Sequence, residues 1–89
     1  MGAQYNIGTA YYYGYGVKLD KKKALKYFKE SAKQGYDVAQ FNIGIMYMTG
    51  EGVERDVEEA QKRWALAAAQ GHQVAQENLA VLQSKNARR

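Results

Sequence analysis

The 89-residue sequence has no cysteine, no proline, a single histidine and a single tryptophan. Without cysteine the chain can form neither a disulfide framework nor a thiolate metal site. No apolar stretch is long enough to span a bilayer, and no basic segment followed by an apolar run opens the chain. The sequence therefore predicts no membrane partner, and it leaves the cellular location unknown. Because proline is absent, we expect glycine and aspartate to mark the ends of the secondary-structure elements.

What the sequence does contain is an internal repeat with a period of 36 residues. The segment AQYNIG at 3–8 returns as AQFNIG at 39–44 and, in weaker form, as AQENLA at 75–80. A period of this length is typical of solenoids, in which each unit buries its apolar face by stacking on the next. We predict one domain over 1–89, with repeat 1 at about 3–38, repeat 2 at about 39–74 and a partial capping repeat at about 75–89.

Each full repeat predicts two antiparallel helices. In the first helix, apolar residues recur at helical spacing and share the face that we expect to point into the core. The first helix ends at Gly14 or Gly50, because glycine adopts the left-handed conformation that closes a helix. The residues of the expected core face are Ala3, Ile7, Ala10 and Tyr11 in repeat 1, and Ala39, Ile43, Met46 and Tyr47 in repeat 2.

The second helix of each repeat begins after an aspartate, Asp20 or Asp56, whose carboxylate can accept hydrogen bonds from amides of the first turn. Asp56 and Glu59 together predict a capping box. Gln-Gly pairs at 34–35 and 70–71 end these helices. A stripe of one large aromatic residue flanked by alanines marks the buried face. The stripe contains Ala24, Tyr27, Phe28 and Ala32 in repeat 1, and Ala60, Trp64 and Ala68 in repeat 2.

The two ends of the array differ from its middle. The third copy has only the first helix of a repeat and finishes in the polar segment 84–89, so we predict a cap with a polar outer face. At the other end no second helix precedes 3–13, which suggests part of a longer array. An apolar edge left uncovered there should favour self-association.

The net charge of +4 is spread unevenly, with +4 on 3–38, −2 on 39–74 and +2 on 75–89. Lysines of repeat 1 align with acidic residues of repeat 2, which predicts ion pairs between repeats on a solvated face. The aligned positions are Lys18, Lys21, Lys22 and Lys23 with Glu54, Val57, Glu58 and Glu59. A nucleic-acid patch is disfavoured, because only one repeat is basic and no continuous stripe results.

The string from Ala3 to Gly35, with its G-x-G-V loop at 14–17 followed by Asp20, closely resembles the Sel1-like repeat, a relative of the tetratricopeptide repeat. The resemblance covers nearly the whole chain. It implies an all-α, right-handed α-solenoid of antiparallel helix hairpins, with two full repeats plus a C-terminal capping helix. It also implies a protein-interaction adaptor of a kind often found in bacteria. Some bacterial members are cysteine-rich, and because this chain has no cysteine, no activity of that branch is carried over.

In solenoids of this kind the first helices resemble the lining of a concave surface. Residues on the side of these helices away from the expected core are therefore candidate partner-binding residues. They are Tyr5, Thr9, Tyr12, Tyr13, Phe41, Ile45, Met48 and Thr49. Tyr5 over Phe41 and Tyr12 over Met48 would form an apolar, aromatic groove suited to an extended peptide or an amphipathic helix. The alternative, that some of these side chains pack between first helices as core, stays open.

Two polar features need an interpretation. Asn6, Asn42 and Asn78 recur in every copy although asparagine is a poor helix former. We prefer a structural bond across helices to ligand binding, because even the capping copy keeps this residue. His72 has no partner at metal-ligand or triad spacing, and is predicted to be a surface residue of a turn. The G-x-G-V loops lack the lysine of a phosphate-binding loop, so we interpret their glycines as helix ends. From both observations together we predict no catalytic, cofactor-binding or metal site, and no cofactor.

The predicted function is a non-catalytic protein-interaction scaffold that binds a peptide or helix of a partner protein on its concave surface. The main alternative is a structural fragment that forms a homo-oligomer through its exposed first-helix face or its uncapped N-terminal edge. Nucleic-acid binding, by base stacking on the tyrosines at 11–13, is a weaker alternative.

Overall fold

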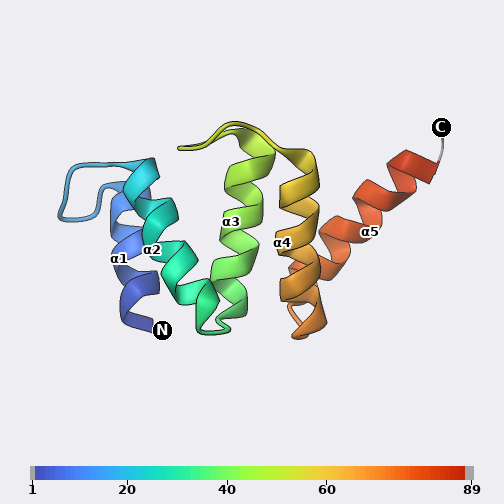
Figure 1. The fold of residues 1–89 in the computed structure, drawn as a ribbon, viewed down its shortest axis with the longest axis horizontal. Coiled ribbons are helices and arrows are strands. Elements are labelled where there is room, and N and C mark those ends of the chain that lie inside the picture. The colour runs from blue at the N-terminus through green and yellow to red at the C-terminus, as the bar shows by residue number, and fades with distance from the viewer. Residues whose placement is uncertain (1, 88–89) are drawn as a thin grey trace.

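The computed structural model describes residues 2–87, with the side chains of 3–84, and this part of the chain forms five α-helices and no strand (Figure 1). The helices are α1 (Gly2–Tyr13), α2 (Lys21–Lys33), α3 (Asp37–Thr49), α4 (Val57–Ala69) and α5 (Gln73–Ala87). Each helix packs chiefly on its neighbours in the chain, and the array extends over 44 × 24 × 17 Å. The predicted all-α helical-repeat fold is confirmed. None of the described helices combines the length and apolar character needed to cross a membrane.

The helix ends are set by the residues that the sequence predicts. The carboxylates of Asp20 and Asp56 accept hydrogen bonds from the third residue of α2 and α4, each at 3.1 Å. Gly14 and Gly50 are left-handed, with φ of 75° and 76°, and close α1 and α3. Only half of the predicted capping box forms, because the Glu59 side chain binds Arg63 while the Asp56 amide donates to the Tyr47 carbonyl.

The core lies between successive helices and is built from one large side chain per layer with small residues around it. Phe28 of α2 and Trp64 of α4 are almost fully buried, and Ile43 and Met46 of α3 are fully buried. The rings of Phe28 and Trp64 lie where a β-carbon on Gly8 or Gly44 would stand. These glycines therefore let the first helix of each pair approach the aromatic residue of the second.

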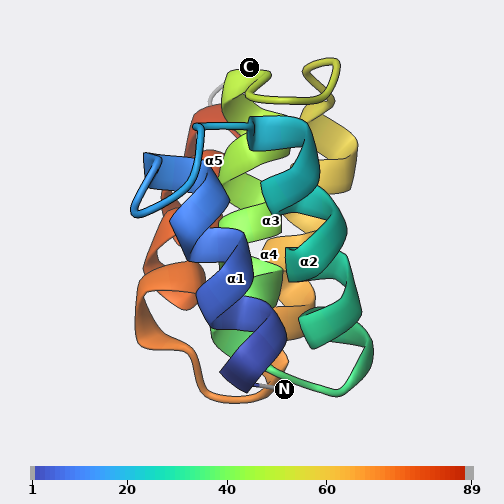
Figure 2. The same cartoon turned by 90° about the vertical axis from the view of Figure 1, so that its left-hand side faces the viewer.

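The predicted core face of α1 is wrong for two of its residues. Ala3 is exposed and Ile7 is 41% exposed, whereas Ala39 and Ile43, one repeat later, are fully buried. The reason is positional: α3 lies between α2 and α4, but in the described chain no helix lies on the outer side of α1 (Figure 2). The same apolar pattern thus produces a core face in one repeat and an exposed edge in the other.

Successive helix pairs are joined by a recurring glutamine. Gln40 of α3 donates from Nε2 to the carbonyl of Ala32 in the last turn of α2, at 3.3 Å. Gln76 of α5 does the same to Ala68 of α4, at 3.0 Å. Each bond is a second one to its carbonyl, because Ala32 and Ala68 also accept from the amides of Gly35 and Gly71.

The capping helix α5 leans away from α4 along its length (Figure 1). Its inner residue Ala75 is fully buried, but Val74 and Val81 are 48% and 58% exposed. The exposed surface of the described part of α5 is therefore mixed, because Gln73, Glu77 and Gln83 are exposed beside these two valines. Of the predicted polar end at 84–89, residues 88–89 lie outside the described part.

Candidate functional site

A hollow of about 420 Å³ opens between α1, α2 and α3. Its walls are mostly aromatic and its polar groups are hydroxyls and one carboxamide. The residues that line it are Tyr5, Thr9, Tyr12 and Tyr13 from α1, Phe28 from α2, and Asn42 and Ile45 from α3. Asn42 Nδ2 donates to the Tyr5 hydroxyl at 3.0 Å across the two helices. We call this hollow the first pocket.

A second, shallower hollow of about 550 Å³ opens between α3, α4 and α5. It is lined by Met48, Trp64, Asn78, Val81 and Leu82. We call it the second pocket.

Four positions of the second pocket lie one repeat after positions of the first. The pairs are Tyr12 and Met48, Phe28 and Trp64, Asn42 and Asn78, and Ile45 and Val81. The two pockets therefore occupy equivalent places in successive helix pairs, and they follow the same side of the array. Their chemistry differs, because the first carries tyrosine hydroxyls and the second is almost wholly apolar.

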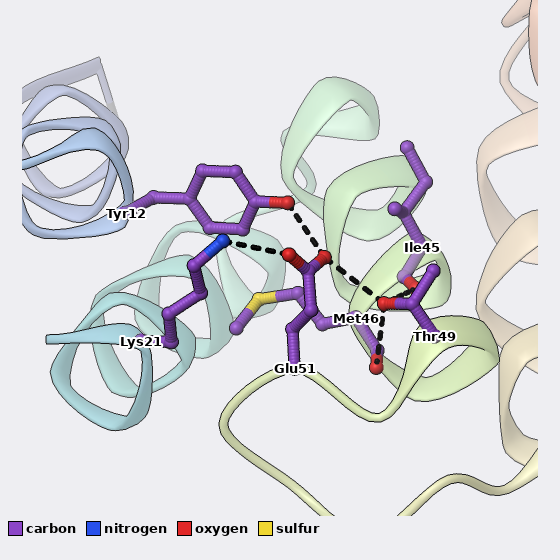
Figure 3. Close-up of polar contacts among 6 residues, drawn as sticks. All are labelled: Tyr12, Lys21, Ile45, Met46, Thr49 and Glu51. Carbon is purple, nitrogen blue, oxygen red and sulfur yellow. Dashed lines mark hydrogen bonds and ion pairs between the residues drawn. The ribbon is translucent and has the colours of Figure 1, made fainter.

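A three-residue polar cluster stands beside the first pocket (Figure 3). Glu51, in the loop after α3, accepts a hydrogen bond from the Tyr12 hydroxyl at 2.7 Å and forms an ion pair with Lys21 at 2.6 Å. The Lys21 ammonium also lies 3.9 Å from the centre of the Tyr12 ring. This cluster ties repeat 2 to both helices of repeat 1 and holds the Tyr12 side chain at the pocket wall.

Glu51 can reach Lys21 because the loop after α3 passes close to the start of α2. Gly52 is left-handed, and a β-carbon on it would stand 2.7 Å from the Lys21 carbonyl carbon. Glycine is required there for both reasons.

The cluster shifts the acidity of both of its acidic groups. The hydrogen bond from Lys21, followed by that from Tyr12, lowers the pKa of the Glu51 carboxyl below its ordinary value of 4.5. Burial, followed by the hydrogen bond to Glu51, raises the pKa of the Tyr12 phenol. At neutral pH Tyr12 is therefore a protonated donor and Glu51 a carboxylate acceptor.

The structure divides the predicted groove residues among three places. The first pocket takes Tyr5, Thr9, Tyr12, Tyr13 and Ile45, and the second takes Met48. Phe41 instead packs against the Trp64 cluster, with its ring stacked 6.2 Å from Trp64 and 4.6 Å from His72. Thr49 bonds to the Ile45 carbonyl and to Glu51, at one end of the first pocket.

His72 is predicted from the sequence to be a surface residue of a turn, but in the structure its side chain makes two contacts. Its Nδ1 accepts the amide hydrogen of Ala75 at 3.2 Å, at the start of α5, and its ring is half-buried against Phe41. It replaces Tyr36, which packs edge-on against Tyr5 at 5.1 Å one repeat earlier. Alignment of the two repeats shows that histidine replaces tyrosine at this position, but it does not show what the histidine contacts.

The predicted ion pairs between aligned lysines and glutamates are wrong. Glu59 pairs with Arg63 in its own helix, and no pair joins Lys18, Lys22 or Lys23 to repeat 2 among the described residues. The pair that does form, Lys21 with Glu51, joins residues that are not aligned. A lysine and its repeat equivalent are separated by a whole helix pair. The Lys21 side chain therefore pairs with Glu51, in the loop that passes close to it, and not with the residue aligned to it.

Within residues 2–87, no cluster of three or more histidine, cysteine, aspartate or glutamate residues has the arrangement of a metal site. The described residues that line the two pockets carry hydroxyl, carboxamide and apolar groups.

Helix pairs stacked in one direction, with equivalent pockets at the repeat period, define a helical-repeat solenoid. A family model of the Sel1 repeat matches residues 2–36 and 37–72. The chain belongs to the Sel1 repeat family, whose members generally are protein–protein interaction scaffolds and typically are not enzymes. The resemblance inferred from the G-x-G-V loop and the aspartate that follows it is confirmed.

Solved structures of the same kind are longer than this chain. A Sel1 repeat protein from Oxalobacter formigenes is 34% identical, with a TM-score of 0.94 over 96% of this chain and 35% of that one. The protein c5321, described as a protective antigen of uropathogenic Escherichia coli strains with an SLR fold, is 39% identical. It matches 86% of this chain and 16% of its own length, with a TM-score of 0.85. No curated protein matches the chain.

Proposed function

We propose that the chain is a non-catalytic scaffold that binds a segment of a partner protein along the side formed by α1, α3 and α5. The observation that carries this proposal is the pair of pockets at equivalent positions, one repeat apart. A polypeptide segment that places one side chain in each pocket would match such an arrangement.

The proposed binding residues are those that line the pockets or stand at their edge. Phe41 belongs to this set only as support, because its ring packs against Trp64. The others are Tyr5, Thr9, Tyr12, Tyr13, Ile45 and Met48, which line the pockets, and Thr49, which bonds to Glu51.

A display library of random dodecapeptides tests this function directly. Peptides selected on the wild-type protein are measured by fluorescence anisotropy against a variant carrying Ile45→Ser and Met48→Ser, one change in each pocket. We expect at least a tenfold loss of affinity, because large apolar contacts dominate such interfaces. The matched control is Leu66→Ser, at an apolar residue of α4 that is 43% exposed and outside both pockets. Equal binding by all three proteins would refute the proposal.

A second candidate function, self-association through the outer side of α1, has an observation of its own. Ile7 is exposed whereas its repeat equivalent Ile43 is fully buried, and Leu19 is exposed in the loop that follows α1. Light scattering with size-exclusion chromatography at high micromolar concentration decides this point. A dimer that dissociates on Ile7→Gln would support the candidate, and a wild-type monomer would refute it.

A further inference from the structure

The aromatic rings at positions 5 and 41 occupy equivalent places, but only one of them has a hydroxyl. Tyr5 lies 5.5 Å from Phe28 and 5.1 Å from Tyr36, measured between ring centres. Phe41 lies against the repeat equivalents of those two rings, Trp64 and His72. The repeat period makes a hydroxyl on Phe41 the counterpart of the Tyr5 hydroxyl, although the Phe41 ring is stacked on His72 at 21° whereas the Tyr5 ring meets Tyr36 at 85°.

The missing hydroxyl leaves Asn78 without the hydrogen-bond acceptor that Tyr5 provides to Asn42. Asn42 donates to the Tyr5 hydroxyl at 3.0 Å, so one of its two amide hydrogens bonds across the two helices and fixes its orientation. For Asn78, one repeat later, the position equivalent to Tyr5 holds Phe41, which has no hydroxyl, and Asn78 has no hydrogen-bond partner among the described residues. Asn78 nevertheless lines the second pocket and is half-buried.

The second pocket thus presents one carboxamide among apolar walls. A carboxamide offers two donor hydrogens and an acceptor oxygen, which match the acceptor and donor of a peptide group. A peptide group placed against Met48, Val81 and Leu82 would lose water and would need such a partner. None of the residues that line this pocket in the described part of the chain is charged, so the occupant that fits them is an uncharged, apolar side chain flanked by backbone amides.

We propose that the second pocket binds an aliphatic side chain of a polypeptide segment while the Asn78 carboxamide hydrogen-bonds the adjacent peptide group of that segment. This inference rests on the proposed function, and names the chemistry of one half of its site. The equivalent Asn42 in the first pocket is already bonded to the Tyr5 hydroxyl, so it has one amide hydrogen fewer to offer to a bound segment. The residue at position 5 or 41 therefore determines the role of the asparagine: Tyr5 gives Asn42 a structural role, and Phe41 leaves Asn78 available for binding.

The probe for this inference is N-acetyl-L-leucine N-methylamide, which carries one aliphatic side chain between two peptide groups. It is titrated into isotope-labelled protein while NMR follows the Asn78 side-chain amide and the Met48 methyl group. We expect saturable shifts at both groups. Asn78→Ala should weaken the binding about fivefold, the effect of one hydrogen bond. 2-Methylbutane, which has the same branched chain without any hydrogen-bonding group, should shift the Met48 methyl group equally in both proteins.

Two conservative variants provide matched controls that keep the pocket packed. Phe41→Tyr adds the hydroxyl that would take up the Asn78 amide, so it should weaken the probe about as much as Asn78→Ala. Tyr5→Phe removes the equivalent hydroxyl from the first pocket, so the Asn42 side-chain amide should begin to shift with the probe.

The outcomes separate this inference from the proposed function. If the probe shifts Met48 equally in the wild type, Asn78→Ala and Phe41→Tyr, the role of Asn78 is wrong and the pocket itself stands. If the probe shifts no residue that lines either pocket, the pockets do not bind polypeptide groups, and the inference and the proposed function both fail.

Discussion

Single residues decide how closely the helices of this array approach one another. Gly8 and Gly44 face the rings of Phe28 and Trp64, and a β-carbon at either position would overlap the ring. Ala80 stands at the third equivalent position, on α5, where it is exposed. The sequence shows the change from glycine to alanine in the third copy, and the structure explains it by the absence of a facing aromatic side chain in the described chain.

Replacing Gly44 by alanine tests this explanation. In an exposed helix the change would stabilise the protein by about 1 kcal/mol, because alanine has the higher helix propensity. Here we expect the free energy of unfolding in urea to fall by about 1–3 kcal/mol, because the added methyl group overpacks the Trp64 ring. Ala80→Gly is the control and should cost at most about 1 kcal/mol. A higher urea midpoint for Gly44→Ala would contradict the packing described.

The Glu51 cluster predicts a pH dependence. The pKa of the Glu51 carboxyl is lower in the folded protein than its ordinary value of 4.5. Its stabilising effect is therefore complete above about that pH, and is lost as the pH falls through the lowered pKa. We expect Glu51→Gln to reduce the free energy of unfolding by roughly 1 kcal/mol at pH 7 and to have a shrinking effect below pH 4.5.

The control for this pH dependence is Glu54→Gln, at an exposed residue of the same loop. Denaturation midpoints of both variants and of the wild type, measured from pH 7 to acid, provide the comparison. A Glu51→Gln effect that is constant over this range would show that the carboxylate does not stabilise the fold through Lys21.

At the scale of the helices, ends and junctions follow rules that act over a few residues. Aspartate caps at 20 and 56 and left-handed glycines at 14 and 50 stand where the sequence predicts them. The junctions between helix pairs were less accessible to prediction. The glutamine at 4, 40 and 76 is visible in the repeat, but its bond to the preceding helix requires knowledge of which carbonyl lies opposite.

Alanine substitution of the three equivalent glutamines measures what the junction contributes. Gln40→Ala should cost about 1–2 kcal/mol, because Gln40 is buried and also accepts from Arg63. Gln76→Ala should cost less, since Gln76 is exposed. Gln4→Ala should be nearly neutral, because the buried Gln4 Oε1 has no partner in the described chain. Equal losses at all three positions, in thermal or urea unfolding, would disprove this account of the junction.

At the scale of the whole molecule, the array is nearly one-dimensional. Each helix packs chiefly on its neighbours in the chain, and the longest dimension is 44 Å. Stability in such an array is a sum of local terms, so a helix that is packed on one side only opens more readily than one between two neighbours. Helix α3 lies between α2 and α4, whereas α5 packs on α4 and carries exposed valines.

Amide hydrogen exchange should reveal this gradient. We expect the slowest exchange at the amides around Phe28 and Ile43, which are buried in the middle of the array. The amides of residues 81–84 in α5 should exchange at least tenfold faster, because local opening there exposes little apolar surface. Uniform protection across α2 to α5 would mean that the described helices unfold as a single unit.

The sequence alone determined the helices, their ends, the repeat period and the family, because these depend on spacing and on interactions within a few residues of the chain. Only the tertiary structure decided that Ile7 is exposed while Ile43 is buried, that Glu51 joins Lys21, and that Asn42 bonds to Tyr5 while Asn78 bonds to none of the residues that the structure describes. These outcomes depend on which side chain of another helix lies opposite. Equivalent residues in a repeat share their backbone position, but their neighbours differ, and the neighbours determine burial and hydrogen bonding.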